Sequence, residues 1–365
     1  MPDTGIRSVR CIWILLSLSC TRSDVNAVLQ SSVAMALSDY DGPNQPGACV
    51  LARHNGALLY ERCFGIADFE TQQHATPETN FRLASVTKQF TATAVLRLVQ
   101  DGAFGTGTAL TQILQEFPSY GDAITVHHLL THTSGLMAYE NVLPSGDESQ
   151  ITDSGVLALM EAQDSTYFVP GSAFRYSNSG YAVLSQIVER VSGVGFGEYL
   201  QQHVFAPVGM AGTVAHVAGV TTVPNRAYGY SRGQDGSWER TDQSRTSAVL
   251  GDGGIYSSIR DLNRWLAVVE GRSSVLAPEL ARLLFEETFL TDGTTAGYGY
   301  GWFIDEYRDR RRFRHDGTTI GFRNEIRVFP DDQLSVVLLT NRNEIGESLK
   351  DAISDVFLDN LDDSR

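Results

Sequence analysis

The sequence predicts an α+β fold in which the two ends of the chain build one sheet and a helical segment is inserted between them. Alternation of apolar and polar residues, which is typical of strands, occurs over residues 47–67 and again over residues 298–340. Between these stretches, apolar residues mostly recur at spacings of three and four, which is typical of helices. Strands at both ends with helices between them favour an α+β body with a helical insertion.

Glycine dominates residues 102–107, and we interpret this break as a crossing between domains. We therefore assign residues 21–104 and 238–365 to an α/β body and residues 105–237 to a helical domain. No internal repeat, low-complexity tract or linker interrupts this arrangement.

Within this frame, the elements are expected in the following order. The expected helices cover residues 24–40, 85–100, 125–130, 180–191, 261–270, 275–289 and 344–361. The expected strands lie within residues 47–67, around an Asn55-Gly56 turn, and over residues 298–304, 311–316, 322–329 and 333–340. Residues 139–153 are polar and predict a long surface loop of the kind that borders a site, and residues 216–250 are rich in turns.

Composition excludes some classes of partner. The 365 residues include 42% hydrophobic residues, which is ample for a large core. A net charge of −15 argues against binding to nucleic acid or to anionic membrane surfaces.

The first twenty residues differ from the rest. Arg7 and Arg10 precede an apolar run over residues 11–18, and small residues follow. This order predicts a secretory signal over residues 1–20, and the run is too short to span a bilayer. Lipid attachment at Cys20 is one alternative, and a start without any targeting role is another. We expect a secreted or periplasmic protein.

Cys49 and Cys63 lie on either side of the Asn55-Gly56 turn. They would be opposite or diagonal across a hairpin, where they could form a disulfide or remain separate buried thiols.

The first chemical motif is Ser85 followed three residues later by Lys88. A helix that starts near Ser85 places both side chains on one face. A buried lysine with a lowered pKa could take the proton of the serine hydroxyl, which is otherwise a poor nucleophile. The chain has only two lysines, Lys88 and Lys350, and arginine, which keeps its proton, is used elsewhere. The alternative is a capping serine followed by a solvated lysine.

Acyl transfer also needs a proton relay and oxyanion donors. Tyr176 could relay protons, because a phenol beside an ammonium can have its pKa lowered towards neutrality. Asn178 could hold Lys88 and a substrate amide. The triplet Tyr139-Glu140-Asn141 has the same spacing, but we place it in the surface loop and prefer Tyr176.

A third motif, His315-Asp316-Gly317, is expected on a late strand. Gly317 would let a substrate backbone approach closely, and the main-chain N–H groups of Thr318 and Ser85 could form an oxyanion hole. The alternative is a polar strand end followed by a turn.

Taken together, Ser85-x-x-Lys88, Tyr176-x-Asn178 and His315-x-Gly317 resemble the motifs of the serine β-lactamase and penicillin-recognising DD-peptidase superfamily. The likeness is greatest to its class C β-lactamase, D-stereospecific peptidase and esterase branch, and residues 129–136, 176–181, 207–210 and 253–257 look like its connecting segments. The resemblance implies an antiparallel sheet flanked by helices, an all-helical domain, and a site between them. It implies an acyl-enzyme at Ser85, with Lys88 and Tyr176 moving protons and with no metal or cofactor.

The third motif departs from the Lys-Thr-Gly that many members of this superfamily carry. A neutral His315 and an ionised Asp316 would repel a substrate carboxylate, unless His315 is protonated or Arg323 compensates. We therefore expect weak handling of penicillins and cephalosporins. Neutral esters, amides, or peptides with a free amino group are the expected substrates, and a β-lactamase or a penicillin-binding sensor without turnover is the alternative.

Two rival sites have weaker support. Gly229-x-Ser231-x-Gly233 matches the nucleophile elbow of α/β-hydrolases, but the flanking residues do not predict the strand and helix which that motif needs. His127, His128 and His132 could bind a metal, but no carboxylate or cysteine has a convincing spacing, so capping and packing are the expected roles.

Overall fold

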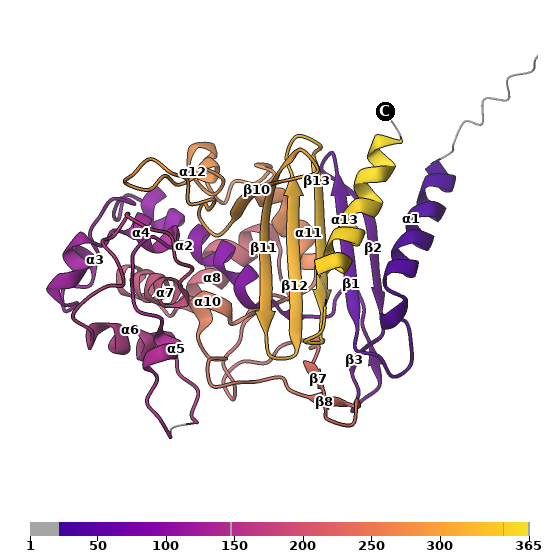
Figure 1. Ribbon diagram of the computed structural model, residues 1–365, viewed down its shortest axis with the longest axis horizontal. Coiled ribbons are helices and arrows are strands. Elements are labelled where there is room, and N and C mark those ends of the chain that lie inside the picture. The colour runs from indigo at the N-terminus through magenta and orange to yellow at the C-terminus, as the bar shows by residue number, and fades with distance from the viewer. Residues whose placement is uncertain (1–21, 147, 346, 364–365) are drawn as a thin grey trace, which may run out of the picture.

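The computed structural model describes residues 22–146, 148–345 and 347–363, so the predicted signal over residues 1–20 and the alternative at Cys20 lie outside the described residues. Helices that flank an antiparallel sheet confirm the predicted fold class (Figure 1). The described part of the chain contains no helix that is long and apolar enough to cross a membrane.

The central sheet has six antiparallel strands in the order β10-β11-β12-β13-β1-β2. Their bounds are β1 (Ala48–His54), β2 (Ala57–Phe64), β10 (Phe303–Tyr307), β11 (Arg310–Thr319), β12 (Phe322–Phe329) and β13 (Leu334–Thr340). Strand β1 pairs with β13, with Ala48 opposite Thr340, so both ends of the chain contribute to one sheet as predicted. Asn55 and Gly56 join β1 to β2 with positive φ angles of 52° and 74°, as a type I′ turn requires.

Helices cover both faces of the sheet. The outer face carries α1 (Arg22–Ala36) and α13 (Glu347–Asp362), which enclose one apolar core with residues such as Val50 and Val336. The inner face carries α2 (Lys88–Gln100) and α11 (Ile259–Val269), which belong to a larger core shared with the helical region. Figure 1 shows α13 in front of the strands and α11 behind them.

The helical region extends the inner core away from the sheet (Figure 1). Its helices are α3 (Leu110–Ile113), α4 (Val126–Leu130), α5 (Tyr139–Val142), α6 (Asp153–Glu161), α7 (Asn178–Ser192), α8 (Phe196–Leu200) and α9 (Ala206–Val208), with η3 (Ser119–Ala123) and the π-turn η4 (Gln201–Phe205). Ser177 caps α7 by accepting the N–H of Gly180, and Gly193 ends it in the left-handed conformation.

The remaining elements are short. They are η1 (Ser38–Tyr40), β3 (Ile66–Asp68), β4 (Gln73–His74), β5 (Phe81–Arg82), η2 (Ala84–Thr87), β6 (Val214–Ala215), β7 (Tyr230–Arg232), β8 (Trp238–Arg240), α10 (Leu250–Gly253), β9 (Ile255–Ser257) and α12 (Pro278–Leu283). The main chain of Tyr228 and Tyr230 bonds to Ala67 and Asn341 of the sheet-bearing part, although we had assigned residues up to 237 to the helical domain.

Three local expectations need correction. The helix expected over residues 275–289 is confined to α12, and the ring of Phe285 beyond it stacks on Phe313. The loop expected over residues 139–153 begins with α5, in which Tyr139 is buried. The strand expected over residues 298–304 is confined to β10, which starts at Phe303.

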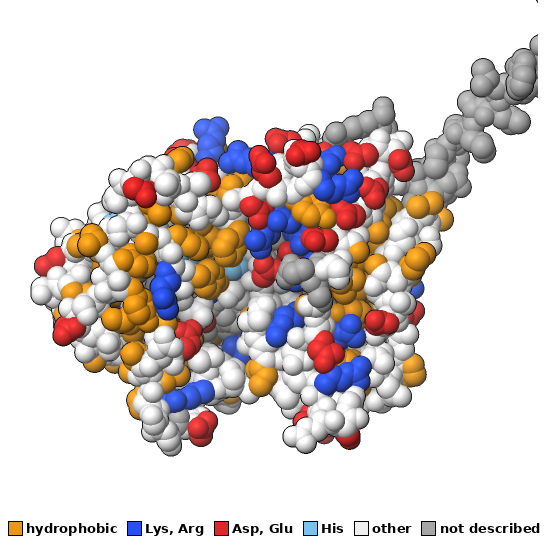
Figure 2. All heavy atoms as spheres, in the orientation of Figure 1, with side chains coloured by type: hydrophobic (Ala, Val, Ile, Leu, Met, Phe, Trp, Pro, Cys, Tyr) orange, Lys and Arg blue, Asp and Glu red, His pale blue; other side chains and the backbone are white. Residues whose placement is uncertain are grey.

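Charged side chains of both signs are interspersed over the sheet on the face shown in Figure 2, whereas hydrophobic side chains gather over the helical region. Arg308 and Arg310, for example, pair with Asp355 and Asp362 of α13. Such ion pairs join the edge of the sheet to α13.

Candidate active site

Ser85 lies in the short 3₁₀ helix η2, between strand β5 and helix α2. The α-helix expected near Ser85 begins three residues later, at Lys88. Ala84, directly before the serine, has a φ of 51°, which is unusual for a residue with a Cβ. Such strain is held in place only by surrounding structure and is common beside reactive groups.

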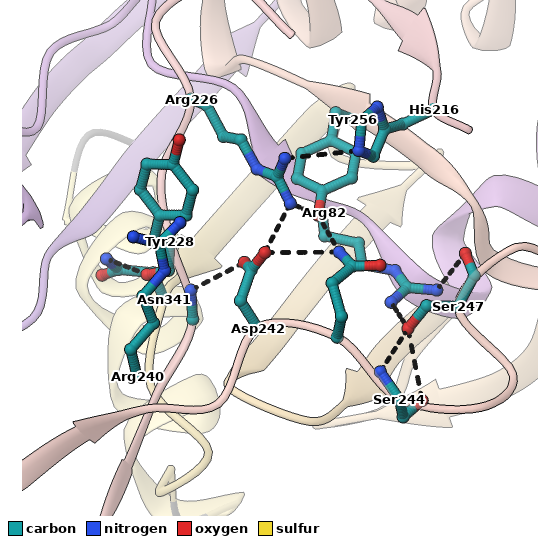
Figure 3. A network of polar contacts seen from close by, with 12 residues as sticks. Arg82, His216, Arg226, Tyr228, Arg240, Asp242, Ser244, Ser247, Tyr256 and Asn341 are labelled. Atoms are coloured by element: carbon teal, nitrogen blue, oxygen red, sulfur yellow. Dashed lines mark hydrogen bonds and ion pairs between the residues drawn. The ribbon is translucent and has the colours of Figure 1, made fainter. Parts of the chain in front are cut away.

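Arg82 anchors this turn from β5. Its guanidinium donates hydrogen bonds to the hydroxyl and carbonyl of Ser247 (Figure 3). It also donates to the carbonyl of Gly253. A neighbouring network joins Arg226 to Asp242 and Tyr256. The side chain of Arg82 is buried, so its charge serves to hold residues 247–253 against the strand that leads to Ser85.

Lys88 is fully buried, and its amine reaches three oxygens. The Nζ atom lies 3.2 Å from Ser85 Oγ, 2.8 Å from Asn178 Oδ1 and 2.8 Å from the main-chain carbonyl of Asp252. Burial lowers the pKa of Lys88 to about 8, against the opposing charges of Asp252 and Glu140. The lysine is therefore much closer to its neutral form near pH 7 than a solvated lysine.

Tyr176 lies beside this pair. The amine of Lys88 is 4.9 Å from the centre of the Tyr176 ring. The Tyr176 hydroxyl is buried and has no hydrogen-bond partner among the described residues. Burial raises its pKa well above 10, although the nearby Ser85 side chain lowers it in part. The expectation of a pKa lowered towards neutrality is therefore wrong, because loss of solvent outweighs the neighbouring charge.

The two rival triplets meet at Asn178. Asn178 Oδ1 accepts from Lys88, as we expected, and its Nδ2 donates to Glu140 Oε1 at 2.8 Å. Glu140 belongs to the triplet that we had placed in a loop, and Tyr139 beside it donates to Asp252 Oδ2 at 3.0 Å. Residues of both triplets therefore line one site.

Sequence reasoning missed Asp252 as part of this site. Its carboxyl is buried, and burial raises its pKa to about 7, against the charge of Lys88. The only sequence signal would have been an acidic residue inside the glycine-rich stretch 251–254, which is too common a feature to single out.

The third motif is arranged differently from our expectation. His315 is buried, and burial together with the charge of Lys88 lowers its pKa to about 3, so the imidazole is neutral. Its Nδ1 donates to the carbonyl of Asp316 at 2.7 Å, and its Nε2 accepts from Tyr298. These bonds hold His315 in the protein interior.

Asp316 faces the other side of β11. Its two carboxylate oxygens accept from Lys350 Nζ of α13 at 2.6 Å and from Arg314 at 2.7 Å. Burial alone would raise the pKa of Asp316, but these two cations lower it. The expectation that Asp316 repels a substrate carboxylate is wrong, because its charge is matched by cations on the outer face of the sheet.

Gly317 lies against the turn that carries Ser85. A Cβ at this position would lie 2.1 Å from the main-chain oxygen of Leu83, so the main chain itself requires glycine here. This contact brings β11 against the turn that carries Ser85. Thr318, the next residue, lines the same small cavity as Ser85.

That cavity has a volume of about 80 Å³. Its lining includes Ser85, Tyr139, Glu140, Asn178, Asp252 and Thr318. Glu140 is the exposed charged side chain in the lining, since Arg82 and Asp252 are buried. A substrate group in the cavity would therefore meet a negative charge.

The rival sites are not assembled among the described residues. Ser231 lies on β7 of a two-stranded hairpin, where its hydroxyl contacts Thr241, and the next element is strand β8 rather than a helix. His127 contacts Tyr300, and the Nδ1 atoms of His128 and His132 accept from the main chain of Thr125 and Ser177. The three histidines face different partners, and no group of three metal-binding side chains occurs in the described part of the chain.

Comparison with known proteins gives a consistent set of relatives. Penicillin-binding protein 4* of Bacillus subtilis (strain 168) is 28% identical over 315 residues, which cover 82% of this chain and 69% of that protein. A D-aminopeptidase of Brucella anthropi is 28% identical over 320 residues, which cover 86% of this chain. The chain spans 59% of the length of that relative.

Solved structures show the same fold. A penicillin-binding protein from Bacillus halodurans aligns with a TM-score of 0.75 and 27% identity, covering 89% of this chain and 99% of that one. The D-amino acid amidase from Ochrobactrum anthropi SV3 aligns with a TM-score of 0.78 and 22% identity, covering 94% of this chain and 99% of that one. The model of the Beta-lactamase family matches residues 35–358, so the chain belongs to the beta-lactamase family of serine hydrolases.

Proposed function

We propose that this protein forms an acyl-enzyme at Ser85 and hydrolyses an ester or amide bond. The contacts of Lys88 carry the proposal. A neutral amine has two N–H bonds and one lone pair, whereas the oxygens of Asn178 and Asp252 can only accept. When Lys88 is neutral, its two N–H bonds are used by these oxygens, and its lone pair is directed to the Ser85 hydroxyl.

The reaction then follows from the positions of these groups. Ser85 Oγ attacks the substrate carbonyl carbon while its proton moves to Lys88 Nζ. The main-chain N–H groups of Ser85 and Thr318 would stabilise the oxyanion. Tyr176, whose raised pKa keeps its phenol protonated, would donate a proton to the leaving group and recover it from Lys88. A water molecule then releases the acyl group by the reverse sequence.

We further propose that the preferred substrate carries an ammonium group near the bond to be cleaved. The support is Glu140, whose exposed carboxylate lines the cavity beside Ser85. The names of a D-aminopeptidase and a D-amino acid amidase among the similar proteins agree with such a substrate. Replacement E140Q should raise KM for an amino-acid amide by up to about fivefold and leave KM for a neutral ester unchanged, since an exposed ion pair contributes about 0.2–1 kcal/mol.

Penicillin binding is the second candidate function, and it is favoured by the names of two similar proteins. The carboxylate of a penicillin would meet Glu140 rather than a free cation, because Arg82 is held by Ser247 and Gly253. We therefore expect slow acylation by penicillins.

A secreted or periplasmic location is also a proposal. It rests on the expected signal over residues 1–20 and is supported by the disulfide between Cys49 and Cys63, because disulfides persist in oxidising compartments.

The test is a substrate screen with the purified protein, using a chromogenic ester, D- and L-amino-acid amides, D-Ala-D-Ala peptides and a fluorescent penicillin. Replacement S85A should abolish turnover of every substrate, whereas the control S231A should retain it. Burst followed by steady release supports a hydrolase, and a lasting label without turnover would support a penicillin-binding sensor instead. Activity that survives S85A would overturn the proposed mechanism.

A further inference from the structure

His132 combines backbone strain with complete burial. It follows α4 and has a φ of 60°, in the left-handed region that residues with a Cβ rarely adopt. Its side chain is 0% exposed. A conformation of this kind costs about 1–3 kcal/mol and persists only where the surroundings enforce it.

In this backbone conformation His132 binds the residues before and after Tyr176 in the chain. The carbonyl of His132 accepts the N–H of Arg175 at 2.9 Å, and its Nδ1 accepts the N–H of Ser177 at 3.0 Å. Residues 173–177 belong to no helix or strand, so Tyr176 depends on such contacts for its position. The two flanking residues of Tyr176 are therefore bound to one residue.

The imidazole ring also packs on Tyr176 itself. The two ring centres are 4.2 Å apart, and the ring of Phe303 is stacked parallel to Tyr176 with a centre-to-centre distance of 6.0 Å. Because Nδ1 accepts a hydrogen bond, a neutral His132 carries its proton on Nε2. Burial and the charge of Lys88 keep the pKa of His132 well below 6.5, so this acceptor is retained.

We propose that His132 is a positioning residue which fixes the Tyr176 phenol beside Ser85 and Lys88. The inference rests on the proposed role of Tyr176 in proton transfer. Among the described contacts, His132 bonds to neither Ser85 nor a residue that lines the cavity, so it would act through the segment that carries Tyr176.

The experiment compares two replacements that both allow the left-handed backbone. In H132N an amide oxygen can replace Nδ1 as the acceptor for Ser177, whereas H132G removes the acceptor and the ring. With the chromogenic ester, H132G should lower kcat about 10- to 100-fold with KM changed less than about threefold, because a displacement of about 1 Å costs this much. H132N should recover most of that loss, and H128A is the control that should not change kcat.

The same replacements are then made in a Y176F background. If His132 acts through Tyr176, H132G should not lower kcat further in the Y176F background. An equal loss of kcat in the wild-type and Y176F backgrounds would overturn the inference. A loss in H132N as large as in H132G would also overturn it. Circular dichroism and thermal unfolding show that each variant is folded. If Y176F alone is fully active while S85A is inactive, the proposed role of Tyr176 falls, and the inference falls with it.

Discussion

Lys88 is held by three oxygens, and the geometry of its amine decides what a replacement does. Arginine at position 88 would retain the positive charge but could not give up its proton at accessible pH. We expect K88R to lower kcat almost as much as K88A, by about 10³-fold or more, because both variants lack the base. Burst kinetics with a chromogenic ester measure this. If K88R keeps most of the activity, the charge of Lys88 matters and its basicity does not.

The pH dependence follows from the same side chain. Burial lowers the pKa of Lys88 to about 8, and the neutral form is the proposed base. The neutral fraction increases as pH rises through this value, so kcat/KM should increase about eightfold from pH 6.5 to 7.5 and level off above pH 8.5. A pH–rate profile with an ester of constant ionisation checks this. A profile that falls over this range would show that the charged lysine is the active form.

The site shows where prediction from single residues succeeds and fails. Ser85, Lys88 and Asn178 meet as predicted, because a helical turn and a rigid helix start fix their directions. Asp316 was misplaced, since successive residues of a strand face opposite sides and the pattern did not fix which face met the site. Glu140 was set aside because a polar stretch resembles a loop, and the short helix α5 within it leaves no clear periodic signal.

At the scale of elements, the β1–β2 hairpin carries the disulfide that the sequence left open. Cys49 lies directly opposite Cys63, and their sulfur atoms are bonded. The sequence indicated that the two cysteines could meet. Side chains of a strand point to alternate faces of the sheet, so the register of the hairpin decides whether both cysteines point to the same face. The long strands of the main sheet and the long helices α1, α2, α7, α11 and α13 were predicted, because their apolar periodicity is sustained, whereas α5 was missed and α12 was predicted too long.

Removal of the disulfide tests its contribution to the hairpin. We expect C49A/C63A to lower the free energy of unfolding by about 2–3 kcal/mol, because a cross-link over 14 residues restricts the unfolded chain. Urea denaturation with and without a reducing agent measures this. The reducing agent should destabilise the wild type and leave the variant unchanged, and an equal effect on both would contradict the assignment.

At the scale of the molecule, the sheet separates two apolar cores, of which only one lies beside the site. The core beneath α1 and α13 contains Phe357, whose buried ring packs edge-on against Tyr60. The site lies on the other face, where α2 and the helical region meet the sheet. The outer core should therefore contribute to stability and leave catalysis untouched.

Replacement F357A tests this separation. It should lower the free energy of unfolding by about 3–5 kcal/mol, as for other large-to-small changes in a core, and leave the KM of the folded protein unchanged. The matched control is M35A on α1, at a side chain that is 74% exposed, which should change stability by less than about 0.5 kcal/mol. A large rise in KM for F357A would show that the two faces are coupled.

The pairing of β1 with β13 has a consequence for how this protein folds during its synthesis. Strand β1 pairs with β2 at once, but its second neighbour β13 is made of residues 334–340, so the ribosome must translate these residues before β1 is paired on both sides. During that interval the nascent β1–β2 hairpin displays an open edge to which other chains could attach. Pairing across so many residues requires the closure of a long loop, so the contact between β1 and β13 is expected to form late in folding.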